Sequence, residues 1–245
     1  MAVLFADIRG FTTRSEAAGA AATFALVNRY LEAIEPAIHA HDGFINKFLG
    51  DGILALYPDA HSAAASARAL QEAVTELNGT LEQEDDEPLR VGVGIHFGPV
   101  MLGTVGGRQQ LDTTVIADVV NTASRVESLT KRYGVDILAT QALIDALDDE
   151  ARVRELDRVR VVGRKEPVTV HQVYWEGQPG SAQRDESYAE ALAAYRAGDL
   201  EAALDGLAAL AADDGPAQRL AGQTRQLLEA GLPPDWNGTL RLAEK

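Results

Sequence analysis

The sequence predicts an α+β fold: a ferredoxin-like domain in βαββαβ order, followed by a small helical extension at the C-terminus. Short alternating apolar runs, typical of strands, are interleaved with longer stretches in which apolar residues recur at helical spacing. Two neighbouring runs flank Gly50-Asp51-Gly52 and indicate an antiparallel hairpin, because glycine adopts the backbone angles that a tight turn needs. This order is typical of an antiparallel sheet with helices on one face.

Composition limits the size and the class of the protein. The 245 residues allow one large domain, or one domain with a small annex, and 46% hydrophobic residues suffice for a core. A formal net charge of −15 argues against nonspecific binding to nucleic acids or anionic membranes. Cysteine is absent, which excludes disulfides and cysteine zinc sites and suits a cytoplasmic location. No signal peptide is visible, and no run approaches the roughly 18 apolar residues of a membrane span.

The first strand and the helix after it form the first candidate site. Residues 2–6 are an apolar run long enough for a buried strand, and Asp7 stands at its end. A helical pattern follows, and Pro36 is expected to bend its last turn. Its apolar stripe consists of Phe24, Val27, Leu31, Ile34 and Ile38. Unpaired amides at the helix start make a natural phosphate site, while the plainer interpretation is that Asp7 caps the helix.

The hairpin of residues 42–57 is the second candidate site. It places the Asp51 carboxylate at its tip and Lys47 on its first strand. Taken alone, an aspartate in such a turn is a common structural feature. The hairpin gains weight beside Asp7, because two carboxylates from neighbouring strands suit a hard divalent ion.

The middle of the chain supplies a third candidate site on a helix. This helix is expected to begin at Asp118, a good N-cap, and to end near Tyr133. Asn121 and Arg125 lie one turn apart on it and share a face, although isolated residues of these types usually serve surface solvation. The other expected elements are helices at 60–77 and 141–147, a solvated acidic loop at 82–87, and strands at 89–97, 100–105, 112–116, 136–139, 153–162 and 168–174.

A linker around Gly177 to Ser181 precedes a helical extension. Residues 188–210 indicate two short helices that break at Gly198-Asp199, similar to one tetratricopeptide helix pair, and residues 217–230 indicate a third helix. One such pair cannot bury its own apolar faces, so it must pack against the main domain, a partner or a second copy. The predicted boundaries are a catalytic domain at 1–176, a linker at 177–184 and an extension at 185–245.

Three motifs together resemble the class III nucleotide cyclase catalytic domain. They are Val3 to Thr12 around Asp7, Lys47 to Gly52 around Asp51, and Thr114 to Arg125. Their order and spacing are highly specific, and the resemblance spans about residues 2 to 175. It implies an adenylate cyclase that converts ATP into 3′,5′-cyclic AMP and pyrophosphate by attack of the ribose 3′-hydroxyl on the α-phosphate. The extension resembles the helical tail of some bacterial adenylate cyclases.

The resemblance implies a site for metals and phosphates. Asp7, Asp51 and the Ile8 carbonyl are implied as ligands of two divalent ions, Mg²⁺ or Mn²⁺, which stabilise the attacking and leaving oxygens. Amides at the first helix and a cation near residue 163 are implied as phosphate contacts. The candidate phosphate-binding residues are Gly10, Phe11, Thr12, Arg164 and Lys165, and the choice between the last two stays open.

The resemblance also implies how the base and the transition state are recognised. Lys47 and Thr114 are implied to read adenine, and the threonine is similar to that of a subgroup with bicarbonate-responsive members. Asn121 is implied to orient the ribose, and Arg125 to stabilise charge on the transition-state phosphate. The resemblance also implies that one protomer supplies the two carboxylates and that the other protomer supplies these four side chains. A homodimer with two composite active sites is therefore expected.

Two other functions stay open. One is a guanylate or diguanylate cyclase, although the Gly-Gly-Asp/Glu-Glu-Phe signature of the diguanylate type is absent. The other is a non-catalytic nucleotide-binding regulatory module built around the helical tail. Because the motifs begin near Met1, we expect an excised catalytic unit with an upstream regulatory or sensor domain outside it; a separate regulatory partner is the alternative.

Overall fold

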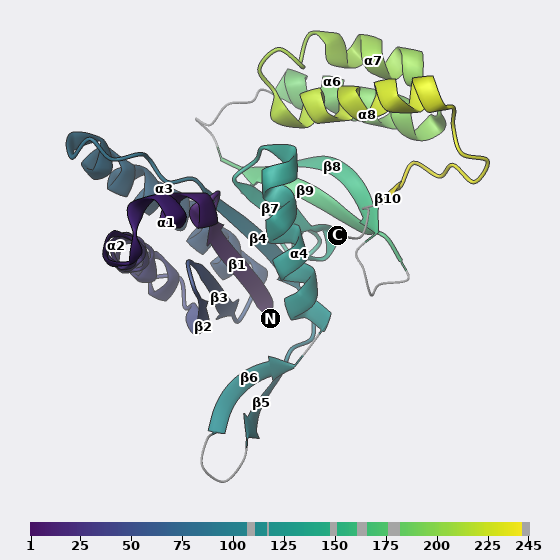
Figure 1. Cartoon of the computed structure of the whole chain (residues 1–245). Coiled ribbons are helices and arrows are strands. Elements are labelled where there is room, and N and C mark those ends of the chain that lie inside the picture. The colour runs from purple at the N-terminus through teal and green to yellow at the C-terminus, as the bar shows by residue number, and fades with distance from the viewer. Residues whose placement is uncertain (107–110, 117, 148–150, 161–165, 176–181, 242–245) are drawn as a thin grey trace. The chain divides into compact units, whose positions relative to one another are not determined.

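The computed structural model describes residues 1–106, 111–116, 118–147, 151–160, 166–175 and 182–241 (Figure 1). The chain divides into two compact units. The first comprises Met1–Lys131 and Asp136–Glu150, and the second comprises Arg132–Val135 and Ala151–Lys245. Helix α4 (Asp118–Tyr133) runs through both, because its last two residues, Arg132 and Tyr133, belong to the second unit. The sequence-based boundary at residue 176 stays a prediction.

The first unit follows the expected βαββαβ order. Its strands are β1 (Ala2–Ile8), β2 (Phe44–Leu49), β3 (Gly52–Tyr57), β4 (Val91–Phe97), β5 (Met101–Gly106), β6 (Leu111–Ile116) and β7 (Ile137–Thr140). Its helices are α1 (Phe11–Ala18), α2 (Ala20–His39), α3 (Ala60–Gln83), most of α4, and α5 (Gln141–Ile144). α3 runs six residues beyond the predicted end at residue 77, so the acidic run 82–87 begins inside it, and its residues are exposed as expected.

Strand β1 lies at the centre of the sheet of this unit. It pairs antiparallel with β3 on one side and with β4 on the other. β2 follows beyond β3, and β7 pairs parallel with β4, which gives the order β7-β4-β1-β3-β2. The β2–β3 hairpin turns at Gly50, whose φ of 73° lies in the left-handed region that favours glycine. This architecture confirms the predicted ferredoxin-like α+β fold.

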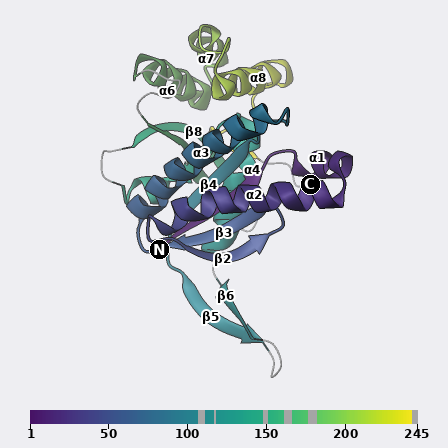
Figure 2. The ribbon, with the colours of Figure 1, turned by 90° about the vertical axis from the view of Figure 1, so that its left-hand side faces the viewer.

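Helices cover both faces of this sheet, which corrects the expectation of helices on one face (Figure 2). On the first face, the buried hydroxyl of Tyr57 forms a 2.7 Å hydrogen bond with Ser66 of α3. On the opposite face, α4 packs into a buried cluster formed by Val3, Leu54, Leu56, Val119 and Ala123. The close approach of α4 depends on Gly94 of β4, since a Cβ there would lie 2.1 Å from the backbone nitrogen of Glu127.

The expected first helix is two helices, α1 and α2, which meet at Gly19. The predicted apolar stripe is partly wrong: Ile34 and Ile38 are buried, whereas Phe24 is 71% exposed. The core face of α2 instead includes Tyr30, which is fully buried. Helical spacing alone does not show which apolar residues of a long amphipathic helix extend beyond the sheet that it covers.

A two-stranded ribbon, β5 and β6, extends away from the sheet of the first unit (Figures 1 and 2). The two strands pair antiparallel with each other, with Gly103 opposite Thr114. β6 leads directly toward the start of α4, so the ribbon and the N-terminal end of α4 are consecutive in the chain.

The second unit combines a small set of strands with a helical bundle. Its elements are β8 (Arg152–Arg160), β9 (Val168–Tyr174), α6 (Ala182–Ala197), α7 (Leu200–Ala208), α8 (Gly215–Ala230) and β10 (Leu240–Arg241). β8 pairs antiparallel with β9 and parallel with β10. The predicted break at Gly198-Asp199 is confirmed, and the Asp199 side chain caps α7 by accepting from Ala202 N at 3.2 Å. No helix in the described part of the chain is long and apolar enough to cross a membrane.

Candidate active site

Strand pairing brings Asp7 and Asp51 together. Ala6 of β1 pairs with Ile53 of β3. The next residue of β1, Asp7, therefore lies beside Gly52, which directly follows Asp51 in the chain. A Cβ on Gly52 would lie 3.1 Å from Asp7 Oδ1, which shows how closely the Asp7 carboxyl approaches the hairpin turn. The Asp51 carboxyl lies close enough to Asp7 to raise the pKa of the Asp7 carboxyl. The convergence expected from the sequence is therefore present within one chain.

The electrostatics of this pair favour a bound cation. The pKa of the Asp7 carboxyl is raised to about 7, first by burial and then by the neighbouring Asp51 carboxyl. A backbone hydrogen bond from Ile8 lowers it by a smaller amount. Two half-buried carboxyls at such close range repel each other when both are ionised, and a divalent ion between them removes that repulsion.

The start of α1 lies directly after this carboxyl pair. Gly10 adopts a left-handed conformation with φ 70°, and no side chain caps the helix in this described segment. The first amides of α1, including those of Phe11 and Thr12, therefore point out of the helix end without a side-chain acceptor. Gly10 and Thr12 are exposed and Phe11 is half-buried, so an anion can reach these amides from solvent.

Helix α4 presents Asn121 and Arg125 on a face that the sheet does not cover. Ala123, between the two residues, and Val126, directly after Arg125, are fully buried. Asn121 is exposed and Arg125 is half-buried. The leading influences on the Asp7 pKa are burial and Asp51, and Arg125 is not among them. Asn121 is therefore accessible to a molecule outside the chain.

The structure describes some of the remaining predicted site residues and not others. Lys47 is half-buried on β2 opposite Leu54, which packs against α4, so Lys47 and α4 lie on the same face of the sheet. Thr114 lies on β6, and its side chain is outside the described residues. Arg164 and Lys165 are also outside the described residues. The roles of all these residues stay predictions.

Glu127 of α4 joins the acidic site, and the sequence analysis missed it. Its carboxyl lies over Gly92, the β4 partner of Asp7: a Cβ on Gly92 would be 2.8 Å from Glu127 Oε1. Burial raises the pKa of Glu127 to about 7, and the charge of Asp7 adds to this effect. The signal that was available is the Gly92-Val93-Gly94 pattern in a strand, which often marks close approach of another backbone.

The described residues contain no group of three or more histidine, cysteine or acidic side chains arranged to hold a metal ion. Among these residues, the candidate metal ligands are therefore Asp7 and Asp51, and Glu127 lies beside Asp7 as a further acidic group. Mg²⁺ commonly binds in this manner, with one or two carboxylates from the protein and further oxygens from water and substrate phosphates. The residues present thus fit a divalent ion that is bound together with a phosphorylated ligand.

Comparison with known proteins identifies the family. The model of the adenylate and guanylate cyclase catalytic domain matches residues 1–174. An adenylate cyclase from Anabaena cylindrica is 38% identical over 182 residues, which cover 71% of this chain and 36% of the relative. Adenylate cyclase 1 from Rhizobium meliloti is 30% identical over 177 residues, 69% of this chain and 27% of the relative. The chain spans about a third of the length of these curated relatives.

Solved structures show the same domain. The adenylyl cyclase CyaB from P. aeruginosa is 27% identical, with a TM-score of 0.63 over 74% of this chain and 96% of that chain. The guanylyl cyclase Cya2 is 28% identical, with a TM-score of 0.63 over 73% of this chain and 93% of that chain. The family model covers well over half of the sequence, and the fold agrees with both structures. The chain therefore belongs to the family of adenylate and guanylate cyclase catalytic domains.

Proposed function

We propose that this protein is an adenylate cyclase that converts ATP into 3′,5′-cyclic AMP and pyrophosphate. The observation that carries the proposal is the close pair of Asp7 and Asp51 at the end of the central strand of a cyclase-family sheet, where burial and Asp51 raise the pKa of Asp7 to about 7. The names of the Anabaena and Rhizobium relatives support ATP as the substrate. A cytoplasmic location, expected from the absence of cysteine, stays a prediction.

Asp7, Asp51 and the Ile8 carbonyl would hold two divalent ions. Bound Mg²⁺ or Mn²⁺ would make the ribose 3′-hydroxyl more acidic and neutralise charge on the phosphates. Asp7 must give up its proton to act as a ligand, so its raised pKa makes loading of the site depend on pH. The first amides of α1, at Phe11 and Thr12, then hold the terminal phosphates at the positive end of the helix.

Side chains outside the carboxylate pair recognise the nucleoside and the transition state. Lys47 donates a hydrogen bond to the adenine ring, and the Thr114 hydroxyl accepts from its exocyclic amine. Asn121 orients the ribose, and Arg125 places its guanidinium on the phosphate oxygens that gain charge. Removing such a preorganised donor typically lowers kcat by about 10²–10³, so Arg125→Ala is expected to be nearly inactive.

The active sites are composite, formed at the interface of a homodimer. Asp7 and Asp51 come from one protomer, whereas Asn121 and Arg125 come from its partner. Large apolar side chains on β2 and β5 support such an interface, because they are half or more exposed and need cover. They are Phe44 at 55%, Phe48 at 55%, Leu49 at 50% and Met101 at 71%.

A turnover assay with product identification tests the proposed activity. ATP or GTP is supplied with Mg²⁺ or Mn²⁺, and the expected result is metal-dependent formation of cyclic AMP, which Asp7→Ala and Asp51→Ala abolish. Cyclic GMP as the main product would instead support the guanylate alternative, to which the likeness to Cya2 lends some weight. Nucleotide binding without turnover would contradict the enzymatic proposal and favour a regulatory module.

Co-expression of inactive variants tests the composite sites. Asp51→Ala with Asn121→Ala leaves one intact site in each mixed dimer, so random pairing in a two-fold dimer restores about a quarter of wild-type activity. The matched control is Asp7→Ala with Asp51→Ala, which damages the carboxylate side of both sites and restores nothing. Equal recovery of activity in both mixtures contradicts shared sites. So does the absence of activity in the Asp51→Ala and Asn121→Ala mixture when mixed dimers are shown to form.

A further inference from the structure

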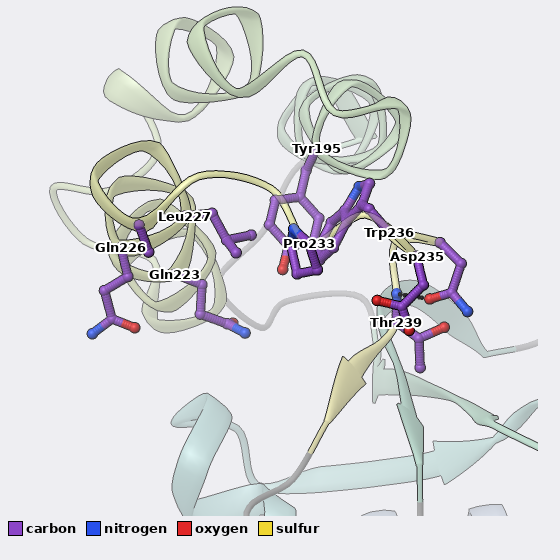
Figure 3. Close-up of a pocket in the computed structure, with 10 residues that line it drawn as sticks. Tyr195, Gln223, Gln226, Leu227, Pro233, Asp235, Trp236 and Thr239 are labelled. Carbon is purple, nitrogen blue, oxygen red and sulfur yellow. Dashed lines mark hydrogen bonds between the residues drawn. The ribbon is translucent and has the colours of Figure 1, made fainter.

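The second unit contains a cavity that the proposed cyclase chemistry does not use. Its volume is about 320 Å³, at the lower end of the range for small-molecule sites. Four side chains of α8 form one wall, the end of α6 contributes Tyr195, and the segment after α8 closes the other side (Figure 3). The lining residues from that last segment are Pro233, Asp235, Trp236, Asn237 and Thr239.

The wall made by the segment after α8 is held in place by specific contacts. The Trp236 ring meets the Tyr195 ring edge to face, with centroids 5.2 Å apart. The Trp236 Nε1 donates to the carbonyl of Arg196 at 3.2 Å, and its backbone nitrogen donates to Pro233 O at 3.0 Å to close a turn. Gly238 packs so closely on Arg196 that a Cβ there would meet it at 2.7 Å. The aromatic wall is thus ordered before any ligand binds.

One polar group in the cavity lacks a partner. Nε2 of Gln223 is buried and forms no hydrogen bond with any residue that the structure describes. Leu227 extends from α8 toward Tyr195 and Pro233, Gln223 lines the cavity below Leu227, and Gln226 points away (Figure 3). A buried donor without an acceptor is costly, and native proteins normally satisfy such a group. An acceptor atom on a ligand in this cavity would satisfy it.

We propose that this cavity binds a small, uncharged, planar ring compound that carries a carbonyl-type acceptor. The ring lies against the apolar surfaces of Trp236 and Leu227, and the buried Tyr195 ring supports Trp236 from behind. The acceptor receives the hydrogen bond from Gln223. A negatively charged ligand is disfavoured, since Asp235 contributes a carboxylate to the lining and the chain carries a net charge of −15. The site is independent of the proposed cyclase activity.

Coumarin is a suitable probe because it is flat, neutral and carries a ring carbonyl. Its matched controls are 2H-chromene, which lacks the carbonyl, and coumarin-3-carboxylate, which adds a negative charge. Binding to the full chain is measured by calorimetry and by the indole N–H signals in NMR. The chain has two tryptophans, so a Trp175→Phe variant identifies the Trp236 signal. We expect saturable coumarin binding that shifts the Trp236 signal, with weaker binding of both controls.

Variants of the cavity complete the test. Gln223→Leu removes a buried group that has no partner, so the variant is expected to fold as wild type does. It also removes the hydrogen-bond donor, so coumarin affinity is expected to fall about fivefold, as for the loss of one neutral hydrogen bond. The same variant leaves 2H-chromene binding unchanged or tighter. Gln218→Leu, at an exposed position of α8 outside the cavity, is the control and keeps wild-type binding. No saturable binding, or equal coumarin affinity in wild type and Gln223→Leu, overturns the proposal.

Discussion

The Asp7 carboxyl lies at the end of a buried strand beside the hairpin turn that carries Asp51. Burial and this neighbour raise its pKa to about 7, and Glu127 experiences a similar shift from burial and from Asp7. Three acidic side chains thus lie close together, and Arg9 offsets only part of the effect of burial and of Asp7 on the Glu127 carboxyl. Such clusters of carboxyls with shifted pKa values are typical of functional sites. The charge repulsion that destabilises the metal-free protein favours binding of a cation.

Asp7→Asn is expected to stabilise the metal-free protein at pH 8 but not at pH 4. The folded-state pKa of about 7 lies above the ordinary value of 3.8, so between these values the folded chain binds more protons than the unfolded chain. The free energy of unfolding of the wild type therefore falls as the pH rises through this window. Asparagine does not ionise, so the variant does not lose this part of its stability. Urea unfolding in EDTA at both pH values measures the difference. An unchanged difference between the proteins from pH 4 to pH 8 contradicts the prediction.

At the scale of single elements, the position of α4 depends on a glycine. Gly94→Ala would place a methyl group 2.1 Å from the backbone of Glu127, so α4 must move away from the sheet. We expect a loss of stability of about 1–3 kcal/mol, typical of overpacking, and a loss of cyclase activity. Thermal unfolding and ATP turnover measure both effects.

Gly79→Ala in α3 is the matched control for that substitution. Nothing lies within 4 Å of a Cβ at Gly79, and alanine is favoured over glycine in a helix by about 0.5–1 kcal/mol. This variant is therefore expected to be slightly more stable than wild type and fully active. If Gly94→Ala behaves in the same way, α4 does not pack as closely as described.

The sequence predicted most elements because strand alternation, helical spacing and turn glycines are local signals. It predicted the meeting of Asp7 and Asp51 because both flank apolar strands that pair as neighbours. It missed the exposure of Phe24, since an apolar residue beyond the sheet has the same spacing as one above it. It also missed Glu127, whose place in the site depends on the pairing of β4 with β1 and on the packing of α4 across them.

At the scale of the whole molecule, α4 runs through both compact units. Its last residue, Tyr133, is 2% exposed and donates a 2.9 Å hydrogen bond to the buried Asp157 of β8. The guanidinium of Arg219 lies over the Tyr133 ring at 5.7 Å, and the start of α8 packs on the Tyr133 carbonyl, 3.0 Å from a Cβ at Gly215. The second unit thus holds the end of the helix that carries Asn121 and Arg125.

Tyr133→Phe is expected to loosen this end of α4. The change leaves the buried Asp157 without the hydroxyl donor, at a cost of about 1–3 kcal/mol, so amide exchange in the last turn of α4 accelerates roughly tenfold or more. It also raises the pKa of Asp157, now about 6, because the Tyr133 hydrogen bond lowers it. Hydrogen exchange followed by mass spectrometry measures the first effect.

Tyr30→Phe is the control for this experiment. The Tyr30 hydroxyl is fully buried but has no hydrogen-bond partner in the described ranges, so its removal deprives no group there of a donor. This variant is expected to keep wild-type exchange in α4 or to slow it. Equal exchange in the Tyr133→Phe variant and in wild type contradicts the anchoring role of Tyr133.

Binding of Mn²⁺, followed by electron paramagnetic resonance of the free ion, tests the metal site most directly. At pH 8 the wild type is expected to bind Mn²⁺, with affinity falling up to about tenfold per unit below pH 7 as the Asp7 carboxyl takes up its proton. Asp7→Asn and Asp51→Asn each weaken binding at least about tenfold, because each removes a charged oxygen ligand. Glu82→Gln, at an exposed acidic position outside the site, binds as wild type does. Wild-type Mn²⁺ affinity in either aspartate variant contradicts the account.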